Sequence, residues 1–132
     1  MARILIVDDS PSQLMGMKRI VEKLGHECLS AEDGAAGVEV AKAEKPDLIL
    51  MDVVMPNLNG FQATRAISKE STTAHIPVVL VTTKDQETDK VWGMRQGAKA
   101  YITKPFSESE LADMIQQMLG GEAPAAPEAS GE

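Results

Sequence analysis

The stretch RILIVDD at residues 3–9 places an apolar run directly before two aspartates, and LILMD at residues 48–52 repeats the arrangement with one aspartate. Two more apolar runs, at residues 78–81 and 100–103, stop at a threonine and at a lysine. The carboxyl ends of parallel strands meet at one edge of an open α/β sheet, and ligands bind in the crevice there. We therefore expect one pocket that brings together Asp8, Asp9, Asp52, Thr82 and Lys104.

Strand-like runs alternate with helical periodicity five times along the chain, which is typical of a parallel sheet covered on both faces. Strands are expected at residues 3–7, 28–31, 48–51, 78–81 and 100–103. Helices are expected at residues 11–24, 35–44, 61–69 and 86–96, and again after residue 107. Short loops and right-handed crossovers allow a doubly wound α/β sheet of strand order 2-1-3-4-5. That order puts its switch point between the first and third strands, where the carboxylates are.

Helix boundaries also have local signals. Ser10 is a good N-cap, and Gln13 can close a capping box with it. A second capping box is expected between Ser107 and Glu110. The side chain of Trp92 lies on the predicted fourth helix, where the pattern leaves two readings open: core or partner surface.

The composition fits one cytoplasmic domain. A formal net charge of −7 and a pI of about 4.8 argue against a nucleic-acid-binding surface, which needs a basic patch. No apolar run is long enough for membrane insertion, the N-terminus has no signal-peptide layout, and the single cysteine excludes an internal disulfide. We expect a domain at residues 1–119 and a disordered acidic tail of Ala, Pro and Glu at residues 120–132.

The expected pocket has the chemistry of phosphoryl transfer. Clustered carboxylates repel one another unless a cation joins them, and Mg²⁺ is the hard cation that suits oxygen ligands. An aspartate beside such a cation can attack a phosphoryl group and form an acyl phosphate. A lysine and a threonine hydroxyl can then stabilise the phosphoryl oxygens.

Four motifs in register resemble those of two-component response-regulator receiver domains. They are VDDS at residues 7–10, MDVVMP at 51–56, VTT at 81–83 and TKPF at 103–106. The similarity covers Ala2 to about Leu119, and it implies the flavodoxin-like, CheY-like form of the fold. Within the family, residues 57–65 and 82–98 are most similar to stand-alone, chemotaxis-like regulators of the PilH type, which act in type IV pilus twitching motility.

The resemblance assigns roles to the strand-end residues. Asp52 would be the phosphoacceptor, and Asp8 and Asp9 would bind Mg²⁺ together with Asp52 and the backbone carbonyl of Val54. Thr82 would bind the phosphoryl group as the switch hydroxyl.

Further roles follow from the same resemblance. Lys104 would pair with the phosphoryl group and would precede a cis peptide bond to Pro105. Tyr101 would be the aromatic residue that swings inward on activation. The phosphoryl group would come from a CheA-like sensor histidine kinase, and a downstream protein would bind the face formed by the fourth helix, fifth strand and fifth helix. The chain would be a signalling protein, not an enzyme.

Four alternatives share some of these features. In the same phosphorelay the chain could be a phosphate sink, or it could act by binding without phosphorylation. A Mg²⁺-dependent phosphohydrolase of the haloacid-dehalogenase type needs an aspartate two residues past the nucleophile, where Val54 stands. A flavodoxin-like binding module needs a first loop of hydroxyl and glycine residues, whereas residues 8–12 begin with two acids.

Overall fold

The computed structural model describes residues 1–120, which alternate five strands with five helices. The strands are β1 (Arg3–Val7), β2 (Glu27–Ala31), β3 (Leu48–Met51), β4 (Val78–Thr82) and β5 (Ala100–Thr103). The helices are α1 (Pro11–Lys23), α2 (Gly34–Glu44), α3 (Gly60–Lys69), α4 (Glu87–Arg95) and α5 (Glu108–Leu119). The predicted elements are confirmed to within one or two residues where both ends were predicted. The predicted tail lies outside the described residues from position 121 onward.

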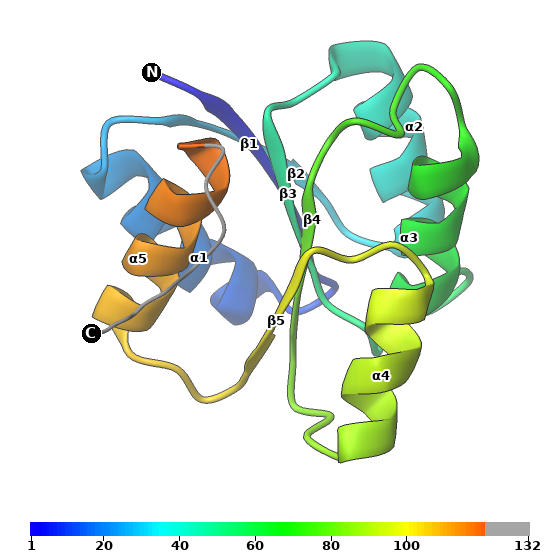
Figure 1. Cartoon of the computed structure of the whole chain (residues 1–132). Coiled ribbons are helices and arrows are strands. Elements are labelled where there is room, and N and C mark those ends of the chain that lie inside the picture. The colour runs from blue at the N-terminus through cyan, green and yellow to red at the C-terminus, as the bar shows by residue number, and fades with distance from the viewer. Residues whose placement is uncertain (121–132) are drawn as a thin grey trace.

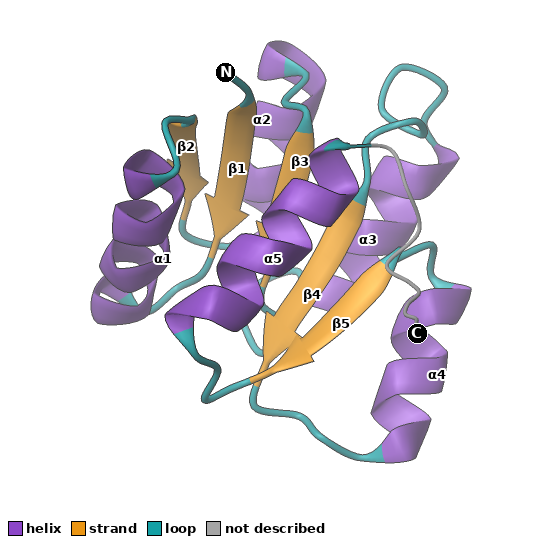
Figure 2. Cartoon of the chain, turned by 60° about the vertical axis from the view of Figure 1, so that its left-hand side comes forward, coloured by secondary structure: helices purple, strands orange, loops and turns teal. Residues whose placement is uncertain are grey.

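All five strands are parallel and follow the predicted order β2-β1-β3-β4-β5 (Figure 2). Helices α1 and α5 cover one face of the sheet, and α2, α3 and α4 lie on the other (Figure 1). The switch point therefore falls between β1 and β3, whose carboxyl ends carry the aspartates. None of the helices within residues 1–120 is long and apolar enough to cross a membrane.

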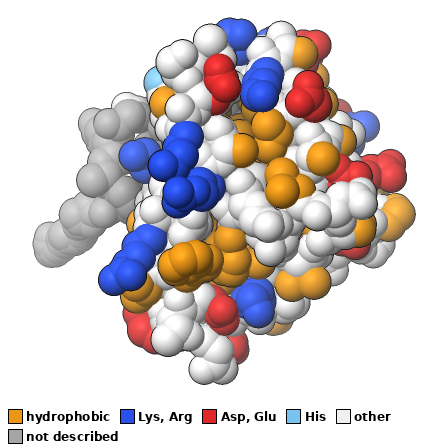
Figure 3. Space-filling model, turned by 90° about the vertical axis from the view of Figure 1, so that its right-hand side faces the viewer, with side chains coloured by type: hydrophobic (Ala, Val, Ile, Leu, Met, Phe, Trp, Pro, Cys, Tyr) orange, Lys and Arg blue, Asp and Glu red, His pale blue; other side chains and the backbone are white. Residues whose placement is uncertain are grey.

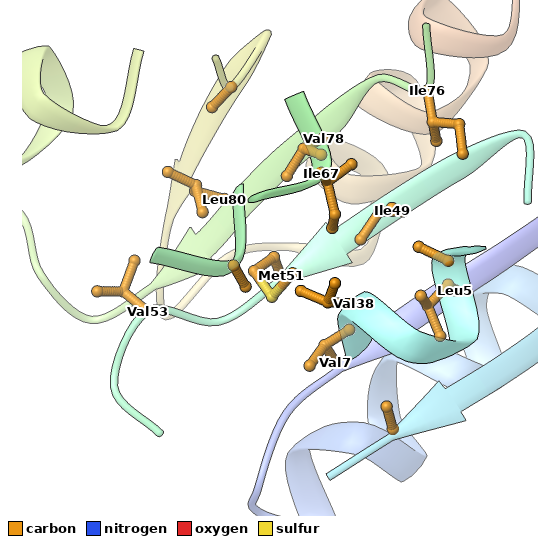
Figure 4. Close-up of a cluster of buried hydrophobic side chains, with 14 residues drawn as sticks. Leu5, Val7, Val38, Ile49, Met51, Val53, Ile67, Ile76, Val78 and Leu80 are labelled. Atoms are coloured by element: carbon orange, nitrogen blue, oxygen red, sulfur yellow. The ribbon is translucent and has the colours of Figure 1, made fainter. Parts of the chain in front are cut away.

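Two hydrophobic clusters, one on each face, hold the sheet between its helices. On the side of α2 and α3, Leu5, Ile49 and Leu80 are fully buried (Figure 4). On the side of α1 and α5, Ile6 and Leu50 are equally buried. Successive side chains of a strand point to opposite faces, so a strand covered on both sides is apolar throughout. This explains why the central strands read as continuous apolar runs.

The helix starts bear out most of the predicted caps. Ser107 and Glu110 form the predicted capping box at α5. The Ser10 hydroxyl accepts a hydrogen bond from the backbone N–H of Gln13 at 3.4 Å, as predicted for an N-cap. The second bond of the box, in which the Gln13 side chain would accept from the Ser10 backbone N–H, is absent, so the predicted capping box is wrong. The Gln13 side chain instead lies in a groove beside Lys104 and Phe106. Trp92 is 51% exposed, which favours a surface role over a core role.

Cys28 is half-buried in β2 and packs against the cluster under α1 and α5. Burial is the main reason that the pKa of its thiol rises to about 11. A thiol reacts as the thiolate, so we expect alkylation by iodoacetamide at neutral pH to be roughly a hundredfold slower in the folded chain than in urea. Mass spectrometry of timed samples measures this ratio, and equal rates would contradict the burial of Cys28.

Candidate functional site

Three carboxylates converge at the carboxyl edge of the sheet. Asp8 and Asp9 follow β1, and Asp52 follows β3, the strand that pairs with β1. One ligand oxygen from each of the three lies within 4.8 Å of the others. Asp8 and Asp52 are buried, with 1% and 8% of their surface exposed, whereas Asp9 is exposed. The predicted meeting of these three residues is therefore present in the structure.

Lys104 contributes a positive charge to this cluster. Its Nζ lies 2.9 Å from Asp8 Oδ2 and 3.7 Å from Asp52 Oδ2, and its side chain is 9% exposed. The backbone N–H of Lys104 donates to the Thr82 carbonyl at 2.8 Å, which continues the pairing of β4 and β5 up to the site. The Lys104–Pro105 peptide bond is cis, as predicted. Lys104 is thus positioned by the sheet itself and lies closer to Asp8 than to Asp52.

The environment of Asp52 makes its negative charge unfavourable. Burial is the largest cause that raises the pKa of Asp52 above its usual value, and the nearby Asp8 carboxylate adds to it. Lys104, the backbone N–H of Val53 and the Thr82 hydroxyl act in the opposite direction. The Val53 N–H donates to Asp52 Oδ1 at 2.7 Å. A buried carboxylate with a neighbouring carboxylate is stabilised by any further cation.

Thr82 and Tyr101 connect the site to α4. Thr82 is fully buried at the end of β4, and its hydroxyl accepts the backbone N–H of Lys84 at 3.3 Å. The hydroxyl of Tyr101 donates to the carbonyl of the same Lys84 at 2.8 Å. Burial, with smaller contributions from the carboxylates of Asp89, Asp52 and Asp85, raises the pKa of Tyr101 to about 12, so the phenol keeps its proton. Both side chains therefore bind the same residue of the loop between β4 and α4.

The loop between β3 and α3 shapes the other side of the site. Val54 is 59% exposed. Gly60 was not singled out from the sequence, where it entered only as part of residues 57–65 in the resemblance to PilH-type regulators. A Cβ at Gly60 would collide with the backbone carbonyl of Asp52, and the N–H of Gly60 donates to the Val53 carbonyl at 2.9 Å. The start of α3 therefore packs directly against the backbone of Asp52.

A small cavity of about 170 Å³ adjoins Asp8 and Asp9. It extends toward α1 and β2, and its lining includes Lys18 and Glu32, neither of which was predicted near the site. Glu32 follows directly after β2, the one strand of the sheet that ends in no predicted site residue. In the sequence this strand is a short and weakly apolar run. For that reason the residue that follows it, Glu32, was not identified as a candidate site residue.

The donor set fits a hard divalent cation. Three carboxylates carry a formal charge of −3, and Lys104 offsets only part of it. Carboxylate oxygens are the preferred protein ligands of Mg²⁺, which usually takes one or two of them and keeps several waters. The exposed position of Asp9 leaves the cluster open to solvent on one side. Such an arrangement can hold an ion and admit a phosphorylated molecule at the same time.

Comparison with known proteins agrees with this geometry. The sequence profile of the "Response regulator receiver domain" family matches residues 4–116. The protein PilH of Pseudomonas aeruginosa is 59% identical over 121 residues, which cover 92% of this chain and 100% of PilH.

Two solved structures show the same fold. The chemotaxis protein CheY4 of Vibrio cholerae has a TM-score of 0.85 at 31% identity, covering 90% of this chain and 99% of that one. The receiver domain of a sensor histidine kinase from Pseudomonas aeruginosa has a TM-score of 0.84 at 29% identity, covering 90% and 98%. The latter structure has a magnesium ion coordinated in its active site cleft.

Proposed function

This chain belongs to the response-regulator receiver domain family, and on that premise we propose that Asp52 accepts a phosphoryl group from a sensor histidine kinase. The observation that carries the proposal is the meeting of three carboxylates and one lysine at the ends of β1, β3 and β5. In this proposal the chain is a response regulator that acts as a phosphoacceptor, with no turnover of an external substrate.

The transfer itself uses an oxygen of Asp52. This oxygen attacks phosphorus while the bond from phosphorus to the imidazole nitrogen of the donor breaks. The electron pair of that bond stays on the imidazole, which takes up a proton. Lys104 and the Thr82 hydroxyl offer a positive charge and a hydrogen bond to the phosphoryl oxygens. Burial of Asp52 favours the reaction, because the poorly solvated carboxylate loses little hydration when it is modified.

We propose that Mg²⁺ binds to Asp8, Asp9, Asp52 and the backbone carbonyl of Val54. When bound, the ion neutralises the attacking carboxylate and the phosphoryl oxygens together. The cluster supports this assignment because its oxygens are close together, hard and incompletely balanced by Lys104.

Lys104 and Mg²⁺ are two positive charges that share the same carboxylates. Replacing Lys104 with Met is therefore expected to tighten Mg²⁺ binding about tenfold, since two positive charges beside the same carboxylates repel each other even in a partly screened site. Isothermal titration with MgCl₂ measures the change. Lys23→Met is the matched control, because Lys23 has an exposed ion pair with Glu108 on α1 and α5. An unchanged dissociation constant in Lys104→Met would contradict the competition.

The signal would pass from the site to the surface through Thr82 and Tyr101. Phosphorylation adds about −1.5 to −2 charge and three acceptor oxygens. The new acceptors draw the Thr82 hydroxyl away from the Lys84 N–H, and the loop that Tyr101 also binds then moves with it. A downstream protein would read this change on the face formed by α4, β5 and α5.

The similarity to PilH supports a place in a chemotaxis-like pathway that controls type IV pilus twitching motility. In this pathway the phosphoryl donor is a CheA-like kinase, and the regulator acts in the cytoplasm.

Intact-mass spectrometry tests the proposal. The chain is incubated with acetyl phosphate, with and without Mg²⁺, as wild type and as Asp52→Ala. The expected result is a gain of one phosphoryl group that requires both Mg²⁺ and Asp52. Full labelling of Asp52→Ala would overturn the assignment. Absence of labelling in the folded wild type, together with no binding of beryllofluoride, would overturn phosphorylation as its mode of action.

A further inference from the structure

The sheet positions the three carboxylates of the site, but it does not position Val54. Asp8 and Asp9 follow β1 directly. The backbone N–H of Asp52 donates to the Val7 carbonyl at 2.9 Å, which extends the pairing of β1 and β3 as far as the acceptor residue. Val54 lies beyond this bond, in the loop between β3 and α3. Its position therefore depends on what the loop itself contacts.

The start of α2 is in close contact with this loop. A Cβ at Gly34 would collide with the carbonyl oxygen of Leu58 and would lie 2.7 Å from its carbonyl carbon. The side chain of Leu58 packs against the hydrophobic cluster on the side of α2 and α3. Helix and loop therefore touch backbone against backbone, through a residue without a side chain.

A pair of polar side chains joins the same two segments. Asp33 Oδ1 accepts the backbone N–H of Ala36 at 2.7 Å and so caps α2. Asn57 Nδ2 donates to the other oxygen, Asp33 Oδ2, at 3.2 Å. Asn57 has a φ of 68°, in the left-handed region that asparagine adopts more readily than most residues. One carboxylate thus holds the first turn of α2 and also the turn of the loop that follows Val54.

Helix α2 is also fixed to the end of β1, the strand that precedes the first two carboxylates. A Cβ at Gly37 would lie 2.9 Å from Val7 Cγ2, and Val7 is fully buried beside α2 (Figure 4). Gly34 and Gly37 are three residues apart, so they lie on the same side of the helix. Helix α2 therefore bridges the end of β1 and the loop that carries Val54.

We propose that Asp33, Gly34 and Asn57 are positioning residues for Mg²⁺, because they hold the loop between β3 and α3 in one conformation on α2. The loop carries the backbone carbonyl of Val54, and the inference rests on the proposed function for the role of that carbonyl as a ligand. Where a loop has several conformations, the apparent affinity falls by the fraction of molecules in the competent one. Contacts that keep one conformation therefore tighten Mg²⁺ binding without touching the ion.

The test compares Mg²⁺ with Ca²⁺ by isothermal titration of the unphosphorylated protein. Mg²⁺ requires nearly octahedral geometry, whereas Ca²⁺ accepts irregular sets of oxygen ligands. Lys, Arg, Asp and Glu side chains are all present on the side of the molecule that carries α2, α3 and α4 (Figure 3), and a change of charge there would act on a bound cation through space. The main variant is therefore the neutral exchange Asn57→Gly, in which glycine keeps the positive φ and removes the amide.

Asn57→Gly should weaken Mg²⁺ binding about fivefold, as the loss of one hydrogen bond allows, and Ca²⁺ binding by less than about twofold. Gly34→Ala should weaken Mg²⁺ binding about tenfold, the lower end of the range for lost outer-shell contacts, because the new Cβ displaces the Leu58 carbonyl. In Asp33→Ser, whose shorter side chain still caps α2, the further change Asn57→Gly should have no effect on Mg²⁺.

A matched control and a stability measurement separate positioning from other effects. Lys45→Gly makes the same exchange at the other non-glycine residue with a positive φ within residues 1–120. Lys45 lies at the opposite end of α2, about 16 Å away along the helix, where its charge is screened at 0.15 M salt, so this variant should bind Mg²⁺ like wild type. Urea unfolding without Mg²⁺ should give Asn57→Gly nearly the midpoint of wild type.

Two results would overturn the positioning role. One is an Asn57→Gly protein with the Mg²⁺ affinity of wild type. The other is an equal loss of Mg²⁺ and Ca²⁺ affinity in Asn57→Gly, since a change in charge or in folding would then explain both. A Gly34→Ala chain that does not fold leaves the decision with Asn57→Gly.

Labelling with acetyl phosphate tells this inference apart from the proposed function. Labelling of wild type at Asp52, together with unchanged Mg²⁺ binding in Asn57→Gly, would remove the positioning role alone. Weaker Mg²⁺ binding in Asn57→Gly, with a wild type that takes up no phosphoryl group and no beryllofluoride, would remove the proposed function and leave the positioning role in place.

Discussion

Replacing Gly60 with Ala is expected to lower the free energy of unfolding by about 3 kcal/mol or more, as is typical when a buried backbone must move. The new Cβ would collide with the Asp52 carbonyl and would lie 2.7 Å from Val53 Cα. Both are backbone atoms next to the site, so no side-chain rotation can relieve the contact. Urea unfolding followed by circular dichroism measures the loss as a lower midpoint.

The same substitution should also reduce phosphoryl labelling, because the backbone that must move carries the acceptor. Gly16→Ala is the control, since Gly16 lies in α1 with no atom within 4 Å of an added Cβ. Alanine is the better helix former, so this control should gain about 0.5–1 kcal/mol. A Gly60→Ala protein with the midpoint of wild type would contradict the close packing of α3 on the Asp52 backbone.

Much of the fold was predictable because its signals are local. The runs at residues 4–7 and 48–51 are apolar throughout, as suits short strands buried on both faces, and short right-handed crossovers allow the strand order that the structure has. The convergence of Asp8 and Asp52 followed in turn, since parallel neighbouring strands end at the same edge. These inferences needed only the pattern along the chain.

Contacts between distant segments were not predictable in the same way. The close approach of Gly60 to the Asp52 backbone depends on the path of a loop, and the preference of Lys104 for Asp8 depends on distances of a few ångströms. The close packing of Gly93 on Leu80 was equally hidden, because a glycine inside a helical pattern signals only a weaker helix. A Cβ at Gly93 would lie 2.5 Å from Leu80 Cδ1, a contact that the pattern along the chain does not indicate.

Replacing Asp52 with Asn is expected to raise the free energy of unfolding at pH 7 without Mg²⁺ by about 1 kcal/mol, an effect common for polar residues held at functional sites. The pKa of Asp52 is higher in the folded chain than its ordinary value of 3.8, chiefly through burial. Between these two pKa values the folded chain binds more protons than the unfolded chain, so wild-type stability falls as pH rises through that window. Above the window the carboxylate keeps its full destabilising effect, which Asn removes.

The cause of the stability difference between wild type and Asp52→Asn can be identified from its dependence on pH and on Mg²⁺. Thermal unfolding of wild type and Asp52→Asn should show the variant ahead at pH 7 and the difference shrinking as the pH falls toward 3.8, where Asp52 is protonated. Added MgCl₂ should stabilise wild type more than the variant, because an ion that binds only the folded state stabilises it in proportion to its affinity. If Asp52→Asn proved less stable than wild type at pH 7 without Mg²⁺, the attraction of Lys104 would outweigh burial at this position. The expected order means that the chain keeps a buried, crowded carboxylate at a loss of stability, and phosphorylation and metal binding are the two events that relieve it.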